Sequence, residues 1–200
     1  MLREIIKVVL ILCAIPIIAF IILMIILQIT FNGFDKDYSV SDLKENFYEK
    51  KSEIYEVKNY LNSITSLNNS VHIEFDDSDR LGIFHVNING KFENNWDVEI
   101  NSSKADSLLN SLGWNKENLM ILKSKLDKAN CIGVSSGEPC VISFQRSGMG
   151  IYSFLVFDDP IPNDQKSSFN DSCSFIMVND KLVLEFSGGV LGSQCFYNLN

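Results

Sequence analysis

The sequence is poor in the residues and motifs from which catalytic sites are usually assembled. It contains two histidines in 200 residues, and it has no Walker A loop, no C-x-x-C pair and no H-E-x-x-H metal motif. Each of these motifs supports a defined chemistry, namely phosphate binding, thiol redox exchange and zinc-dependent hydrolysis. Their absence favours a non-catalytic binding or interaction protein over an enzyme, and we expect no cofactor.

Positive charge is also scarce. The chain has 17 Lys and Arg residues against 25 Asp and Glu residues, a net charge of -8. Setting aside Arg3, Lys7 and Glu4 leaves 15 basic and 24 acidic residues in the remainder. Nucleic acids and anionic lipid surfaces both bind basic patches. We therefore exclude nucleic acid as the main partner.

The most conspicuous feature that is present is a long apolar segment near the amino terminus. Twenty residues from Val8 to Leu27 carry no charge, and as a helix at about 1.5 Å per residue they would reach about 30 Å, the thickness of a bilayer core. The segment has no polar stripe that could face water. A cleaved signal peptide is the alternative, but its apolar region is usually shorter and ends in a small-residue cleavage site. The sequence predicts a retained transmembrane helix.

The anchor sets the predicted domain organisation. We expect a short cytoplasmic tail over residues 1–7, a transmembrane helix over 8–29, a linker over 30–40 and one extracytoplasmic domain over 41–200. Lysine and arginine flank the apolar segment on both sides, so the positive-inside rule alone does not fix the orientation. The expected location is the cell membrane, as a single-pass signal-anchor protein in contact with the lipid bilayer through residues 8–29.

Four cysteines in the predicted domain favour the extracytoplasmic side. An even number of cysteines in a modest domain is typical of disulfides formed in an oxidising compartment. Their spacing lacks the short knuckles of zinc sites. Local closure favours two bonds, Cys131 with Cys140 and Cys173 with Cys195. The two other connectivities, and four unpaired core cysteines, stay open as alternatives.

Hydrophobic periodicity predicts the elements of this domain. Apolar residues at helical spacing indicate one long helix from Ser41 to about Leu67, with Ser39 or Ser41 as its N-cap. Further helices are expected over 103–112, ended by Gly113, and over 116–129, capped by Asn115. Alternating patterns predict strands over 71–75, 81–88, 92–100, 131–135, 140–146, 151–157, 173–178 and 181–187. The order of these elements indicates an α+β fold with a mainly antiparallel sheet.

The hairpin around Asn89-Gly90 raises a question of register. Asn-Gly is typical of a two-residue type I′ turn. That turn would put Phe92 and Trp96 on the face opposite Phe84 and Val86, whereas a three-residue loop would put all four on one face. Because a slip of one residue inverts every side chain, we predict the three-residue loop.

The candidate site residues are His72, Glu74 and His85. His72 and Glu74 share one face of a strand, and His85 points the same way if its strand lies alongside. Two imidazoles and a carboxylate can bind a transition metal with open positions. H-x-E is common on amphipathic strands, so the metal site is a weak candidate and a solvated sheet face is expected instead.

The sequence is compatible with three functions. The leading one is a membrane-anchored, non-catalytic extracytoplasmic domain that binds a protein or another envelope ligand. The first alternative is an envelope hydrolase or metal-dependent enzyme that uses His72, Glu74 and His85. The second is an accessory subunit of a membrane complex, in which Pro16 kinks the anchor against its neighbours.

Overall fold

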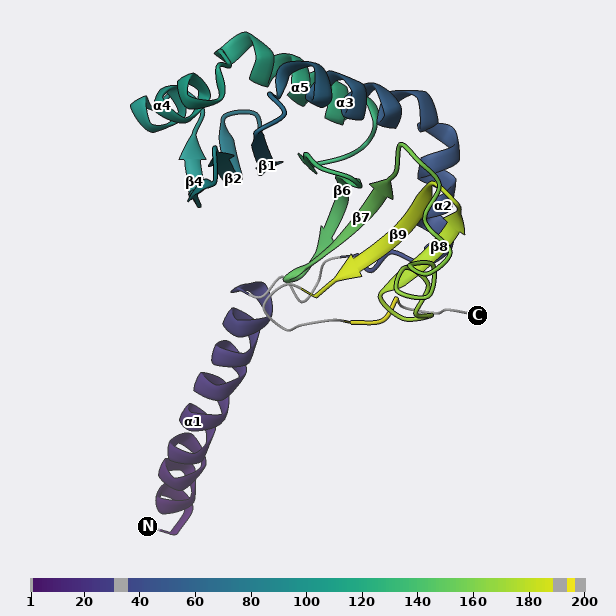
Figure 1. Cartoon of the computed structure of the whole chain (residues 1–200). Helices are drawn as coiled ribbons and strands as arrows, with labels where there is room; N and C mark the ends of the chain where they lie inside the picture. The colour runs from purple at the N-terminus through teal and green to yellow at the C-terminus, as the bar shows by residue number, and fades with distance from the viewer. Residues whose placement is uncertain (1, 31–35, 189–193, 197–200) are drawn as a thin grey trace.

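The computed structural model describes residues 2–30, 36–188 and 194–196, and within the first helix it describes the side chains of Arg3 and of residues 14–27. The described chain has α+β character and a mainly antiparallel sheet (Figure 1). Its helices are α1 (Leu2–Thr30), α2 (Val40–Glu49), α3 (Lys51–Ile64), α4 (Ser103–Leu112) and α5 (Lys116–Lys128). Its strands are β1 (Asn69–Phe75), β2 (Arg80–Ile88), β3 (Lys91–Glu93), β4 (Trp96–Glu99), β5 (Gly133–Ser135), β6 (Cys140–Ser147), β7 (Gly150–Val156), β8 (Phe175–Asn179) and β9 (Leu182–Ser187).

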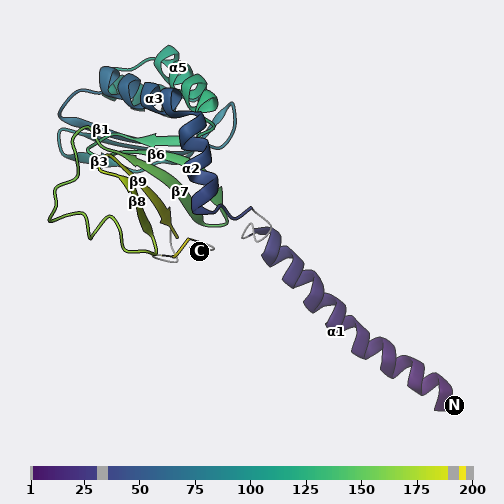
Figure 2. The ribbon, with the colours of Figure 1, turned by 90° about the vertical axis from the view of Figure 1, so that its right-hand side faces the viewer.

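The strands form one sheet in the order β3-β2-β1-β5-β6-β7-β9-β8, and β4 also pairs with β2. Every recorded pair is antiparallel. Helices α2, α3 and α5 lie on one face of this sheet, as two perpendicular views show (Figures 1 and 2). The main hydrophobic core fills the space between the helices and this face, and includes Leu43, Leu61, Phe84, Leu122 and Phe154.

Among the described elements, no helix covers the other face of the sheet. A smaller apolar cluster covers its β7–β9 half, where the segment after β7 folds back over the strands and buries Ile161 beside Val183. The β1–β2 half of this face has no such cover among the described residues. We call this half, from β3 to β5, the open face.

Helix α1 is continuous over 29 residues and extends away from the sheet and its covering helices (Figures 1 and 2). Its side chains are exposed throughout residues 14–27. Within the part of the chain that the structure describes, no helix combines the length and the apolar character needed to cross a membrane.

Most predicted helix ends are confirmed by their capping contacts. Ser39 begins α2 in a reciprocal capping box with Asp42, and Asn115 begins α5 in the same way with Asn118. Gly113 ends α4 with a φ of 76°, the left-handed conformation that glycine adopts without strain. The single long helix predicted from Ser41 is wrong. The chain leaves helical geometry at Lys50, so α2 and α3 are separate helices.

The predicted three-residue hairpin loop is also wrong. Ile88 pairs with Lys91, and the two residues between them, Asn89 and Gly90, both have positive φ, as a type I′ turn requires. Phe92 consequently lies opposite Asn87 and is 74% exposed. The turn chemistry of Asn-Gly therefore determines the register, and the aromatic side chain is left outside the core.

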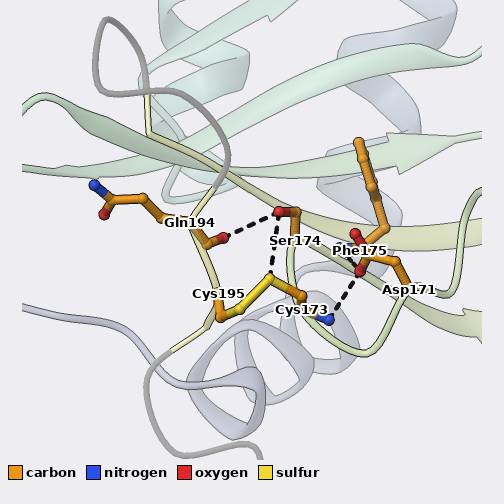
Figure 3. Close-up of a disulfide and its surroundings, with 6 residues drawn as sticks. All are labelled: Asp171, Cys173, Ser174, Phe175, Gln194 and Cys195. Atoms are coloured by element: carbon orange, nitrogen blue, oxygen red, sulfur yellow. Dashed lines mark hydrogen bonds between the residues drawn. A yellow bond between two sulfur atoms is a disulfide. The ribbon is translucent and has the colours of Figure 1, made fainter.

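One predicted disulfide is confirmed and the other is absent. Cys173 and Cys195 are bonded, and Ser174 beside them donates a hydrogen bond to the Gln194 carbonyl (Figure 3). Cys131 and Cys140 are free, buried thiols. Strand β5 pairs Gly133 with Ser143, so Cys131 and Cys140 lie at opposite ends of the β5–β6 hairpin. A disulfide requires Cα atoms within about 7 Å, which this register does not allow.

A buried ammonium connects helix α3 to the sheet. Lys58 is 1% exposed and donates a hydrogen bond to the Val156 carbonyl at 2.9 Å. Its charge is balanced by Asp158 at 2.9 Å and by Glu138 at 3.7 Å. The contact with Lys58 lowers the pKa of Asp158. This ion cluster holds the turn between β5 and β6 against the end of β7.

Candidate functional site

The two histidines lie next to each other on the open face. His72 on β1 and His85 on β2 are direct cross-strand partners, and their ring centroids are 5.7 Å apart in an edge-to-face arrangement. The sequence-based expectation that both imidazoles point the same way is therefore confirmed. Strand alternation produces this geometry, because Val71 and Ile73 on either side of His72 point into the core.

Two irregularities in the strands bring Trp96 to the same place. Phe75 pairs with Leu81 and Glu74 with Ile83, so Gly82 is an extra residue in β2. Strand β4 has its own irregularity next to this bulge. Asp97 lies between the partners of Leu81 and Ile83, and its φ is 51°. Val98 thereby faces the core while Trp96 lies on the open face, with its ring 4.9 Å from that of His85.

The two histidines line a shallow pocket of about 220 Å³. Its lining consists of Ser70, Val71, His72, His85, Val86, Asn87, Phe92, Asn94 and Ser135. We call it the histidine pocket. Two buried polar atoms in its wall, His85 Nε2 and Asn87 Oδ1, have no hydrogen-bond partner among the described residues. Buried polar atoms normally have partners, so a ligand or water that reached these two atoms would supply hydrogen bonds that they lack.

The surroundings of both imidazoles favour the neutral form. Burial lowers the pKa of His72, an effect that the Glu74 carboxylate opposes and that His85 and Arg146 reinforce. Burial also lowers the pKa of His85. Since the ordinary value is 6.5, both rings are mainly uncharged near neutral pH. A neutral imidazole can accept or donate a hydrogen bond.

The third candidate residue, Glu74, is engaged elsewhere. Both of its carboxylate oxygens accept hydrogen bonds from Arg146, with Nη2 and Oε2 2.8 Å apart. Within the described residues, no group of three or more His, Cys, Asp or Glu side chains is arranged to hold a metal ion. The metal site suggested by the sequence therefore lacks the carboxylate that it required.

Ser135 is not among the site residues predicted from the sequence, but it lies opposite His72 and lines the pocket. Gly133, Ser135 and Gly137 match the G-x-S-x-G pattern, and that pattern was the available signal. In an α/β-hydrolase this serine lies on a sharp turn from a strand into a helix. Here Ser135 ends β5, and the chain turns back into strand β6. The pattern therefore does not form a nucleophile elbow.

The buried neutral state of His72 gives a testable dependence on pH. In the unfolded chain the imidazole titrates near 6.5, whereas in the folded chain its pKa is lower. Stability due to His72 is then fully present above the unfolded value and is lost as the pH falls below it, because the unfolded chain binds the proton first. We expect the free energy of unfolding to drop less in His72→Gln than in the parent between about pH 7.5 and about pH 5.5.

Urea unfolding at the two pH values measures this difference. Burial raises the pKa of Glu185, so the stability due to this group changes with pH in the opposite direction. The parent therefore serves as the reference for the variant, and an equal drop in both proteins would contradict the role of His72.

Compared with protein-family models, curated proteins and solved structures, the chain shows no significant match.

Proposed function

We propose that this chain is a single-pass membrane protein, anchored through residues 8–29, whose domain from residue 41 onward binds a ligand on the extracytoplasmic side without catalysis. The observation that carries the proposal is the pairing of two features. One is a long apolar segment in a helix that stands apart from the domain, and the other is an open sheet face with unpaired buried polar atoms.

Residues 8–27 support an anchor, because they carry no charge and α1 is continuous across them. Exposed isoleucine, leucine and phenylalanine side chains fill the described part of the helix, from Ile15 to Leu27. A soluble protein rarely exposes an apolar surface of this extent. Insertion in a bilayer would remove it from water.

The Cys173–Cys195 disulfide supports the extracytoplasmic side. Structural disulfides persist in oxidising compartments and are rare in the cytosol. The net negative charge of the domain is compatible with a position beside an anionic membrane.

Alkaline carbonate extraction and thiol labelling on intact cells test this proposal. We expect the full chain to stay in the membrane pellet. In a Cys13→Ser background, a membrane-impermeant maleimide should label the chain only after treatment with an impermeant reductant. The matched control is a Cys173→Ser/Cys195→Ser variant, in which Cys131 and Cys140 stay unlabelled because they are buried. Extraction into the carbonate supernatant, or labelling that requires broken cells, would overturn the proposal.

The second candidate is a serine hydrolase, favoured by the position of Ser135 directly opposite His72. Catalysis would require the imidazole to accept the proton of the Ser135 hydroxyl. Among the described residues, no hydrogen bond joins these two side chains. A fluorophosphonate probe distinguishes the candidates. The binding proposal predicts no labelling of the full chain, whereas labelling that disappears in Ser135→Ala would establish the hydrolase.

A further inference from the structure

The histidine pocket selects against charged ligands. None of the described residues that line it is a lysine, arginine, aspartate or glutamate, and both imidazoles are mainly neutral near pH 7. Glu74 and Arg146, two charged groups that act on His72, form an ion pair with each other. A phosphate, carboxylate or ammonium group would lose hydration here without gaining an opposite charge. The pocket therefore favours a neutral ligand.

The same pocket selects against purely apolar ligands. Its lining residues include two histidines, two asparagines and two serines. Asn87 Oδ1 requires a donor, and His85 Nε2 accepts or donates according to its tautomer. An apolar occupant would leave both atoms unpaired, which costs free energy. Hydroxyl groups on a ligand both donate and accept, so they can satisfy both atoms.

Exposed aromatic rings complete the surface. Phe92, in the pocket wall, is 74% exposed, and Trp96, in contact with His85, is 61% exposed. The face of an aromatic ring carries partial negative charge. It attracts the weakly positive C–H groups that line one side of a sugar ring. Aromatic rings beside neutral polar groups are therefore complementary to a saccharide.

An extended peptide fits this position less well. Strand β1 pairs with β2 on one side and β5 on the other, and β2 pairs with β1 and with β3 and β4. The main-chain groups of β1 and β2 under the pocket are therefore committed to the sheet. A peptide could not add a strand here, which is the usual source of affinity for extended peptides on sheets.

We propose that the histidine pocket binds a neutral oligosaccharide, with a sugar ring against Phe92 and Trp96 and its hydroxyls bonded to His85 Nε2 and Asn87 Oδ1. Asn94 lines this pocket and also a neighbouring pocket of about 400 Å³ along β4. The ligand therefore extends over more than one sugar ring. This inference rests on the proposed binding function and names the ligand class of that site.

Titration of the purified full chain tests the inference. The detergent must lack a sugar head group, because maltosides and glucosides would compete. The probes are cellotetraose, maltotetraose and chitotetraose. Trp96 is exposed and Trp114 is 3% exposed, so a saturable change in tryptophan fluorescence reports on the open face. We expect at least one of the three probes to bind.

Variants locate the binding site. We expect Asn87→Ala and His85→Ala each to weaken binding about tenfold, as truncation of a central contact does. Trp96→Ala should weaken it similarly when measured by calorimetry, which does not depend on the indole. Tyr48→Ala is the matched control, since Tyr48 is 63% exposed on α2 and away from the pocket. Circular dichroism establishes that each variant is folded.

Three results would overturn the inference. The first is that no tetrasaccharide binds at a concentration of about 10 mM, because a dissociation constant above this value is too weak to be a useful affinity. The second is binding that Asn87→Ala and His85→Ala leave unchanged. The third is histidine-dependent binding of zinc chloride or of a strand-forming peptide in place of the sugars. Carbonate extraction and thiol labelling need no ligand, so they show independently whether the anchored, extracytoplasmic arrangement also fails.

Discussion

Replacing Arg146 by methionine should lower the free energy of unfolding by about 3 kcal/mol or more. The Glu74 side chain is 5% exposed, whereas that of Arg146 is 37% exposed. Both guanidinium contacts go to the Glu74 carboxylate, and they raise the pKa of Arg146. Removal of Arg146 would leave a buried carboxylate without its counter-charge. That desolvation cost, and not the attraction between the two charges, makes the effect large.

Urea unfolding of the full chain in detergent, followed by the fluorescence of buried Trp114, measures the loss. Glu74→Leu/Arg146→Met removes both charges and should recover most of the stability, since apolar replacement of a buried pair is often neutral. Lys116→Met is the surface control. Lys116 is 3.2 Å from Asp106, both side chains are about half exposed, and the expected loss is below about 1 kcal/mol. A loss in Arg146→Met no larger than in this control would contradict the argument.

The parts of the fold that the sequence predicts correctly are those determined by contacts within a few residues. Ser39 and Asn115 cap helices through side-chain bonds to residues three positions away. Gly113 ends a helix through its own backbone conformation. The alternation of Val71, His72 and Ile73 places the imidazole on one face of β1. Each of these signals is local and can be recognised without knowledge of the tertiary structure.

The parts predicted wrongly depend on distant partners or on assumed burial. Phe47 and Ile54 are seven residues apart, which is compatible with one continuous helix, so nothing in their spacing reveals the break at Lys50. The hairpin register was predicted from the assumption that Phe92 and Trp96 are buried. Both are exposed, and the Asn-Gly turn determines the pairing instead.

The candidate site was predictable only in part, because some of its contacts are local and others join distant residues. Its two histidines follow from strand alternation, but the position of Trp96 depends on the bulge at Gly82 and on the left-handed Asp97. The engagement of Glu74 by Arg146 joins residues 72 positions apart in the chain. Strand order is not evident from periodicity. The sequence therefore could not show that Arg146 binds the carboxylate that the metal hypothesis assigned to the metal.

Reduction of the Cys173–Cys195 bond should lower the free energy of unfolding by about 3 kcal/mol, the chain-entropy value for a loop of this length. The bond joins residues 22 apart and holds the segment 194–196 beside β8. Phe196, which is 3% exposed, packs against Tyr152 and Phe186 and donates its backbone N–H to the Cys173 carbonyl. Without the cross-link, these contacts alone must order the segment.

Cys173→Ser/Cys195→Ser should reproduce the loss, and its unfolding should not change further with reductant. Alkylation of the folded, reduced chain in a Cys13→Ser background identifies the thiols involved. Cys195 is exposed and should react first. Burial raises the pKa of Cys140 to about 12 and also raises that of Cys131, so these thiols carry little reactive thiolate and should react only after unfolding. A peptide cross-linked through Cys131 and Cys140 in the unreduced protein would contradict both the pairing and the expected loss.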